Sequence, residues 1–394
     1  MTLPQRIALP LAILTAGCLE AQEPAVVDGL PQASAVADLT IAFTDAHLLS
    51  RPLGMVVDRR GHLRVVEAME STVFVFDSAG RFLGRRGRGG RGPGEFESPG
   101  AIGTLDDSVW VSDSRLRRVS WFDLDGNHLH TRPWSSPARA PVFTPNEVRG
   151  VFVDGTAAAE AGVPGALLGS GSVTEVPLLR LDAEGTVLDT LHLLDVGSTT
   201  LMLEIRDLRS FTAQPFGARD LWAAFPDGSG VVVVERSAAG SDGTVPVEVT
   251  RLTPGGERVW SRVLESSARP VTSAEVDSAV AAIAERRRHL VSNRRTLERQ
   301  VRRELHVPAY HPPVERVVAA ADGRVLLRRR FPEPSGRYGW VVLESAGVPQ
   351  AAVTVDTAVH VRWAGGRHLW GVRRDELGIP ALVRLRRAEG PDGR

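Results

Sequence analysis

Short runs of alternating apolar and polar residues, separated by turn sequences, recur along most of the chain. The first complete unit covers residues 54–84, and its apolar runs lie at residues 54–57, 63–66, 73–76 and 82–83. Alternation over roughly four to eight residues between turn sequences is typical of β-strands that are joined as hairpins. The pattern therefore predicts an all-β chain built from consecutive antiparallel strands.

The turn that ends each third strand recurs, with an acidic or hydroxyl residue first and a glycine fourth. Copies lie at residues 77–80, 123–126 and 182–185, and looser copies lie at residues 253–256 and 344–347. Asp at the first position and Gly at the fourth are preferred in type I turns. Repetition at about forty to fifty residues is typical of β-propeller blades, and six such units fit the 394 residues.

The sixth unit has only three strands in sequence, at residues 359–363, 368–372 and 381–385. Residues 39–43 form a strand pattern that has no hairpin partner nearby. We therefore expect them to add the fourth strand of the sixth unit, which closes the ring and leaves no open sheet edge. The third unit is the least regular, and its small, glycine-rich residues 157–171 predict an irregular connection.

A glycine-rich loop at residues 87–99 precedes two strands and a turn, and the order of these motifs is informative. The motifs are Gly94-Glu95-Phe96-Glu97-Ser98-Pro99, Val111-Ser112-Asp113, Arg118-Val119 and Phe122-Asp123-Leu124-Asp125-Gly126. This order resembles the repeat of NHL-type β-propellers and of six-bladed propellers of exported bacterial proteins. The resemblance is close over about forty residues and implies a six-bladed β-propeller with four-stranded antiparallel blades.

The resemblance also implies structural roles for five residues of this segment. Asp113 and Arg118 are expected to form an ion pair that bridges adjacent strands of one blade. Gly94, Phe96 and Pro99 are expected to shape the loop and to anchor it on the core. Propellers host many unrelated activities, so the resemblance predicts a fold and not a function.

Residues 87–92 also spell Gly-x-Gly-x-x-Gly, the fingerprint of dinucleotide-binding folds. That fingerprint follows a strand and opens a helix. Here Pro93 and Gly94 follow at once, and the next periodic segment is a strand. We therefore interpret the glycines as a crossover between two blades, where they allow positive φ and close backbone approach.

The N-terminus predicts export. Arg6 precedes the apolar run at residues 7–16, which is too short to span a membrane. The run ends in Leu14-Thr15-Ala16-Gly17-Cys18, which resembles a bacterial lipobox and implies lipid attachment at Cys18. The alternative is an ordinary signal peptide cut near Ala21. We expect an outer-membrane lipoprotein of the bacterial cell envelope, or otherwise a periplasmic or secreted protein.

One segment breaks the strand rhythm. Residues 272–275 read Thr-Ser-Ala-Glu, a capping box, and apolar residues recur at helical spacing as far as Leu305. We predict one helical insertion at residues 272–305, with a break near Asn293, that packs its apolar stripe on the propeller. Its many arginines are interleaved with Glu285, Glu298 and Glu304, so a solvated face is favoured over a surface for anionic lipid or an acidic partner.

These elements define the expected domain organisation. It comprises a signal peptide at residues 1–17, a flexible tether at 18–38, one propeller domain at 39–388 that contains the insertion at 272–305, and a disordered tail at 389–394. Cys18 is the only cysteine, so no disulfide can form within the chain.

Charge and histidine content narrow the function classes. The chain has 47 acidic and 47 basic residues, and all the basic ones are arginine, so lysine-dependent catalysis is excluded. The zero balance gives no reason to expect nucleic acid as a partner. His128 and His130 are the only close histidine pair and are best interpreted as solvent-facing strand residues. His306 and His311 precede the fifth unit and are candidates for a ligand site at the propeller mouth.

We expect a monomeric extracytoplasmic binding protein rather than an enzyme, with no cofactor, no metal and no catalytic residue to nominate. Its partner would be a small molecule, a glycan, a peptide or a protein, and the lipid anchor would add a membrane contact. Resemblance to propeller lactonases and lyases supplies an alternative, an enzyme with a metal on the propeller axis. A structural scaffold is the third interpretation, and it predicts no concave polar pocket.

Overall fold

The structure is a computed structural model that describes residues 24–387, with gaps at 45–46, 135–143, 163–172, 197–199, 206–207, 237–242 and 291–292. The predictions for the signal peptide, Cys18 and residues 388–394 lie outside the described residues. No helix among the described residues is long and apolar enough to cross a membrane.

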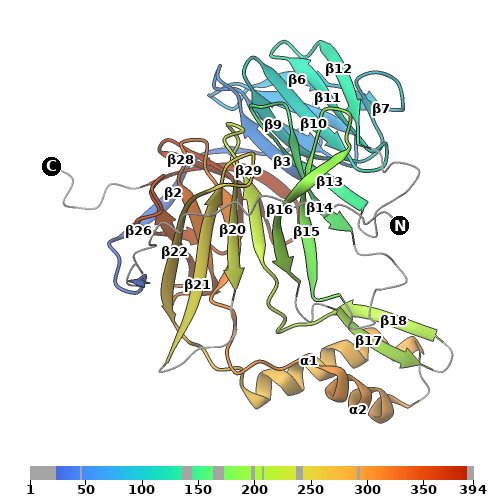
Figure 1. The fold of residues 1–394 in the computed structure, drawn as a ribbon, viewed down its shortest axis with the longest axis vertical. Coiled ribbons are helices and arrows are strands. Elements are labelled where there is room, and N and C mark those ends of the chain that lie inside the picture. Colours follow the sequence, from blue (N-terminus) through green and yellow to red (C-terminus); the bar gives the residue numbers. More distant parts are fainter. Residues whose placement is uncertain are drawn as a thin grey trace, which may run out of the picture.

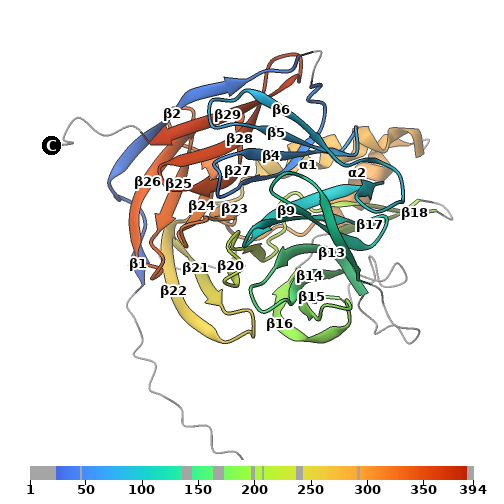
Figure 2. The same ribbon diagram turned by 90° about the horizontal axis from the view of Figure 1, so that it is seen from above.

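Six four-stranded antiparallel sheets are arranged as blades around a common axis (Figure 2). From the inside outward, blade one has strands β3 (Pro52–Val57), β4 (Leu63–Glu67), β5 (Thr72–Phe76) and β6 (Phe82–Arg86), and blade two has β9 (Pro99–Leu105), β10 (Ser108–Asp113), β11 (Arg118–Asp123) and β12 (His128–Pro133). Blade three has β13 (Thr144–Val151), β14 (Ala157–Gly162), β15 (Glu175–Leu181) and β16 (Val187–Asp195), and blade four has β19 (Leu221–Ala224), β20 (Val231–Arg236), β21 (Thr244–Leu252) and β22 (Arg258–Ser267). Blade five has β23 (Val314–Ala319), β24 (Val325–Pro332), β25 (Arg337–Leu343) and β26 (Pro349–Asp356), and blade six has β27 (Val359–Gly365), β28 (His368–Arg374), β29 (Pro380–Arg387) and β2 (Gln32–Ile41).

The innermost strands form the wall of a central channel. They contact each other around the ring in the order β3, β9, β13, β19, β23 and β27, and β27 returns to β3. Because each blade has four antiparallel strands, the chain leaves an outermost strand on the face where the next innermost strand begins. All six innermost strands therefore start on the same face of the ring.

Strand β2 closes the ring. It pairs antiparallel with β29 from Ala35 to Ile41 and parallel with β26 from Gln32 to Ser34. The strand predicted at residues 39–43 is thus the end of a longer strand that stops at Ile41. By joining the edges of two neighbouring blades, β2 pairs backbone groups that would otherwise be open to other chains.

The prediction of a flexible tether at residues 18–38 is wrong for residues 24–38, which lie along the outer edges of the blades. Strand β1 (Ala25–Val26) pairs parallel with β22, and Asp28 accepts hydrogen bonds from Ser267 and forms an ion pair with Arg329. The outer edges of blades four to six offer unpaired backbone groups, which this segment satisfies. Its buried Val27 and Ala35 add apolar contact.

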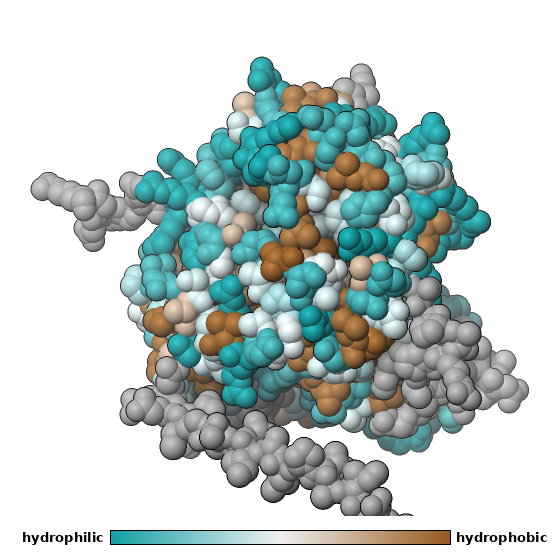
Figure 3. All heavy atoms as spheres, turned by 45° about the horizontal axis from the view of Figure 1, so that its top comes forward, coloured by the Kyte–Doolittle hydropathy of each residue, from teal (hydrophilic) through white to brown (hydrophobic). Residues whose placement is uncertain are grey.

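The apolar core is divided among the six blade interfaces. Each pair of neighbouring blades encloses one cluster of buried side chains, for example Val232, Val234, Val325 and Leu327 between blades four and five. Alternate residues of each strand enter the clusters on its two sides, which is how period-two patterning packs sheet on sheet. The face of the molecule that Figure 3 shows is, by contrast, mostly hydrophilic with separate apolar patches.

The recurring turns form as predicted. The amides of Gly80, Gly126 and Gly185 donate to the carbonyls three residues earlier, at 2.9, 3.0 and 3.1 Å, and each glycine has positive φ. The irregular connection predicted at residues 157–171 is wrong at its start, since Ala157–Gly162 is strand β14. Small side chains fit this strand, because Ala158 and Ala159 are fully buried in the two interfaces with the neighbouring blades.

Two insertions meet in an accessory module below the ring (Figure 1). One is the hairpin of β17 (Thr200–Ile205) and β18 (Leu208–Ala213), between blades three and four. The other contains α1 (Ser273–Arg286), the 3₁₀ turn Arg288–Leu290 and α2 (Arg294–Glu304), between blades four and five. Short strands β7 (Arg88–Gly89) and β8 (Glu95–Phe96) lie in the glycine-rich loop.

The helical insertion forms as predicted, with one correction. The capping box at Thr272 and Glu275 is present, and the helix is interrupted before Asn293, which caps the second helix. The apolar stripe packs on the hairpin rather than on a blade, because Ile283, Leu297 and Val301 share a cluster with Leu201 and Leu203. Both insertions leave from outermost strands, so the module lies on the face where the innermost strands begin.

Candidate ligand-binding channel

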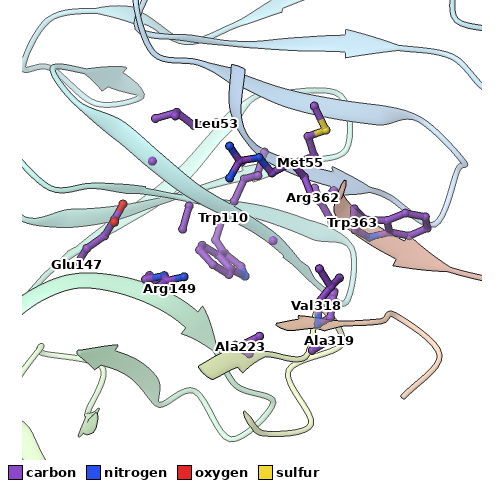
Figure 4. A pocket seen from close by; sticks show the side chains of 18 of the residues that line it. Leu53, Met55, Trp110, Glu147, Arg149, Ala223, Val318, Ala319, Arg362 and Trp363 are labelled. Carbon is purple, nitrogen blue, oxygen red and sulfur yellow. The ribbon is translucent and has the colours of Figure 1, made fainter. Parts of the chain in front are cut away.

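The central channel is a cavity of about 520 Å³. Every innermost strand contributes lining residues, and Figure 4 shows Glu147 and Arg149 from β13 on one side and Arg362 and Trp363 from β27 on another. Pockets of roughly 300–1,000 Å³ hold drug-sized ligands. The channel is thus large enough for a small organic molecule.

Five charged residues line the channel, and four of them are arginines. These are Arg51, which precedes β3, Glu147 and Arg149 on β13, Arg316 on β23 and Arg362 on β27. The set leaves three net positive charges inside one cavity. The balance of the whole chain is zero, so positive charge is concentrated here.

Among the residues that the structure describes, no hydrogen bond or ion pair engages the guanidinium groups of Arg51, Arg149, Arg316 and Arg362. Arg149 stacks on Trp222, with 4.9 Å from its Cζ to the ring centroid. The single channel carboxylate, Glu147, accepts a hydrogen bond from the Ser112 hydroxyl at 3.3 Å.

The pKa values of the channel residues reflect this crowding of charge. Burial and repulsion from Arg362 and Arg328 lower the pKa of Arg316 to about 10. Burial and repulsion from Arg374 lower the pKa of Arg362. The neighbouring His360, which is outside the lining, has its pKa lowered by burial and by repulsion from Arg316 and Arg362. In each case the protonated form has lost the solvation that it has in water. A bound anion would compensate for this loss and stabilise the protonated form.

Backbone interactions place these side chains. Glu67 at the end of β4 accepts hydrogen bonds from the amides of Ser50 and Arg51, at 3.1 and 2.8 Å, and so fixes the chain where it approaches β3. Glu147 lies against Gly100, where a Cβ atom would come within 2.0 Å of its Oε1. A side chain at position 100 would therefore displace the Glu147 carboxylate from its place in the channel.

Asp113 and Arg118 do not form the expected ion pair. They are paired across β10 and β11, but both side chains bind the glycine-rich loop instead. The Asp113 carboxylate accepts hydrogen bonds from four backbone amides, those of Glu97, Ser98, Arg115 and Leu116, at 2.7–3.1 Å. Arg118 donates to the carbonyls of Arg91, Gly92 and Glu95. Unpaired carbonyls and amides of a crossover loop need such partners.

The loop residues Gly94, Phe96 and Pro99 lie where they shape the crossover. Phe96 is 1% exposed and packs on Phe122, with ring centroids 5.9 Å apart. Gly94 has φ of +71°, which favours glycine. Pro99 begins β9 and lines the channel.

Neither histidine that was proposed for ligand binding lines the channel. His306 is exposed, and its amide donates to the Gln214 side chain. His311 is 4% exposed and lies between Phe216 and Phe331, with its Nε2 3.3 Å from Glu275 at the start of α1. His311 thus connects the module to blade five. On β12, His130 stacks on Trp121 and His128 contacts Thr131.

Sequence reasoning missed the channel arginines. Arg149, Arg316 and Arg362 each lie within the first strand of a blade, where the apolar pattern is interrupted. A charged residue inside an otherwise buried strand was the available signal. Among the described residues, no group of three or more His, Cys, Asp or Glu residues is placed to hold a metal ion.

Comparisons with known proteins concern the fold. A family model described as a 6-bladed beta-propeller matches residues 44–136, which contain blades one and two. No curated protein matches the chain.

Solved structures are similar over most of the chain. A member of the DUF4221 family from Bacteroides vulgatus has a TM-score of 0.50 and 9% identity and covers 91% of this chain and 99% of its own. A protein of Bacteroides fragilis described as exported has a TM-score of 0.43, 10% identity and the same coverage. A gluconolactonase of Xanthomonas campestris has a TM-score of 0.41 and 12% identity and covers 92% and 99%.

At 9% identity, the similarity to the DUF4221 structure concerns the fold alone. The six four-stranded sheets and the matched family model agree with each other. The chain is a six-bladed β-propeller.

Proposed function

We propose that this protein binds a small anionic molecule in the central channel. The observation that carries the proposal is the pair Arg316 and Arg362, which line the cavity and whose guanidinium groups have no hydrogen-bond or ion-pair partner among the described residues. Burial lowers the pKa of both groups, so their charged forms are poorly solvated. An anion bound in the channel would stabilise these charged forms.

Arginine suits this role for physical reasons. The guanidinium group is planar, stays charged and presents its N–H donors in a fork that matches carboxylate and phosphate oxygens. Protein walls around the channel reduce screening by water, so a charge pair is stronger there than on the surface. The scaffold interpretation predicted no concave polar pocket, and the charged channel therefore supports binding over a purely structural role.

The lactonase-like alternative would need several oxygen or nitrogen ligands around one point on the axis. Glu147 is the one carboxylate among the described residues that line the channel. The arginines of the lining suit the binding of an anion, whereas a metal-dependent enzyme would need further oxygen or nitrogen ligands beside Glu147. We therefore propose a binding protein.

Isothermal titration with inorganic phosphate and with citrate, at fixed ionic strength, tests the proposal. Arg316→Gln and Arg362→Gln should each weaken binding at least about tenfold, the usual effect of losing one charged hydrogen-bond donor. Arg303→Gln is the matched control, because it removes the same charge from the exposed face of α2, and it should change binding less than about twofold. Equal weakening by all three variants, or no binding of either anion to the wild type, would overturn the proposal.

We also propose that the protein is exported and lipid-anchored at Cys18. The apolar residues 7–16 and the segment Leu14–Cys18 support this proposal. A palmitate analogue should label the wild type in cells, and Cys18→Ala should abolish the label. Equal labelling of the variant would leave an ordinary signal peptide as the explanation for export.

A further inference from the structure

The lining of the channel changes character along its axis. On β3 and β23 an arginine comes first in the lining and apolar residues follow: Arg51 precedes Met55 and Val56, and Arg316 precedes Val318 and Ala319. On β27 Arg362 lies between Val361 and Trp363, and on β13 Glu147 and Arg149 lie in the second half of the strand. Because all six innermost strands begin on one face, Arg51 and Arg316 lie toward that face, Arg362 lies in the middle of its strand and Arg149 lies farther along the channel. On β3, β19 and β23 the far part of the lining is formed by uncharged residues.

Several apolar side chains remain partly exposed in the channel. Leu53, Ile102, Ala223 and Val317 line it and are neither fully buried nor fully solvated. On β19 the lining runs from Trp222 to Pro226 without a charged or hydroxyl residue. Apolar surface that faces a narrow cavity gains free energy when an apolar ligand covers it.

We infer that the ligand is an anionic amphiphile, with a carboxylate or phosphate head at the arginines and an apolar body along the uncharged wall. This inference rests on the proposed anion site and adds the chemistry of the rest of the ligand. An inorganic anion fills a small part of the 520 Å³ and leaves the apolar wall wet. An organic anion uses both parts of the lining.

A homologous series of linear carboxylates tests the inference. Acetate, butyrate, hexanoate and octanoate share one head group and differ only in apolar length. Burial of each added methylene strengthens binding about fourfold at most, so affinity should rise steadily along the series until the wall is covered. Hexanol, which has the same body without the charge, should bind at least about tenfold more weakly than hexanoate.

Two kinds of variant separate the head from the body. Arg362→Gln should weaken every member of the series by the same factor and leave the dependence on chain length unchanged. Val317→Thr keeps the side-chain shape but adds a hydroxyl, so it should weaken octanoate severalfold and leave acetate unchanged. Ile102→Thr provides a second variant of the wall, and melting curves establish that each variant is folded.

The outcomes distinguish the two claims. If neither phosphate, citrate nor any carboxylate binds the wild type, the anion site itself is wrong. If these anions bind and Arg362→Gln weakens them, but affinity does not rise from acetate to octanoate, the amphiphile inference alone is wrong. It is also wrong if octanoate binds Val317→Thr and Ile102→Thr as tightly as it binds the wild type, since octanoate would then lie elsewhere.

Discussion

The propeller ring and the accessory module are stabilised in different ways. In the ring, each blade packs on the two blades next to it, and every blade interface has its own apolar cluster. In the module, one cluster holds together a hairpin and a helix pair that come from separate insertions. Residues Leu201 and Val301 meet in that cluster although blade four lies between them in sequence.

The difference has consequences for stability and for function. The ring has no free end, so the loss of one strand affects the closure of the whole domain. The module contributes one small core and connects to the blades at a few points, so it can unfold locally while the ring stays folded. The ring holds the channel arginines in place, and the module lies on the face toward which Arg51 and Arg316 lie.

Removal of residues 1–41 should have the largest effect on stability. It deletes β1 and β2, exposes the edges of β22, β26 and β29 and uncovers the apolar surface around Ala35 and Ile41. We expect a loss of about 5 kcal/mol or more, with aggregation through the open edges. The control, removal of residues 1–23, should melt like the full chain, and equal melting temperatures for the two truncations would contradict ring closure by β2.

Ile283→Asp should destabilise the module and spare the ring. Ile283 is 2% exposed in the module cluster, and even Ile283→Ala should cost about 2–5 kcal/mol locally. Hydrogen exchange should then be faster in α1, α2 and β17, while the amides of β4 and β20 stay protected. Loss of protection in the blades as well would mean that the ring and the module are one cooperative unit.

Asp113→Asn should weaken the crossover between blades one and two. Its carboxylate accepts four backbone hydrogen bonds, and an amide group can accept at one oxygen only. We expect a cost of about 2–3 kcal/mol in denaturant unfolding. Asp107→Asn removes an exposed charge that pairs with Arg59 and should cost less than about 1 kcal/mol, so equal effects would argue against the role of Asp113.

Acid should weaken the attachment of the module before it weakens the ring. Hydrogen bonds from Thr272 lower the pKa of Glu275 from 4.5 to about 2, so its contribution is present above pH 4.5 and is lost as the pH falls toward 2. Burial lowers the pKa of His311 below 6.5, so protonation of the unfolded chain also reduces stability as the pH falls below 6.5. Glu275→Gln should flatten the profile between pH 4.5 and 2, as measured by melting temperature, and an unchanged profile would show that this cap is not the titrating group.

Arg287→Ala should have the smallest effect. Its guanidinium group donates to the Phe211 carbonyl at 2.7 Å on the exposed surface of the module, where water can replace it. We expect a change below about 1 kcal/mol in the unfolding free energy of the module. A larger loss, confined to α1 and β18, would mean that this contact rather than the apolar cluster holds the two insertions together.

The sequence predicted features that depend on near neighbours. The turns at Gly80, Gly126 and Gly185 and the capping box at Thr272 are local, so a few residues specify them. Strand β2 was found in part because the sixth blade lacked a strand. The predicted ion pair of Asp113 and Arg118 was wrong because the choice between a strand partner and loop amides depends on where the crossover lies.

The features that sequence reasoning missed depend on the assembled ring. Arg316 and Arg362 are far apart in sequence and meet only because six innermost strands enclose one cavity. The hairpin of β17 and β18 is short, and it is stabilised by helices that begin about seventy residues later. In the sequence, the alanines of β14 suggested an irregular segment. In the structure they belong to a strand, and small residues are needed there because the two neighbouring blades approach closely.

A crystal soaked in iodide tests the central claim most directly, because the anomalous signal of iodide shows where an anion binds. The account predicts a peak inside the channel, within contact distance of the guanidinium groups of Arg316 and Arg362, that disappears in Arg316→Gln/Arg362→Gln crystals. Peaks that occur only at surface arginines such as those of α2, with an empty channel in the wild type, would contradict it.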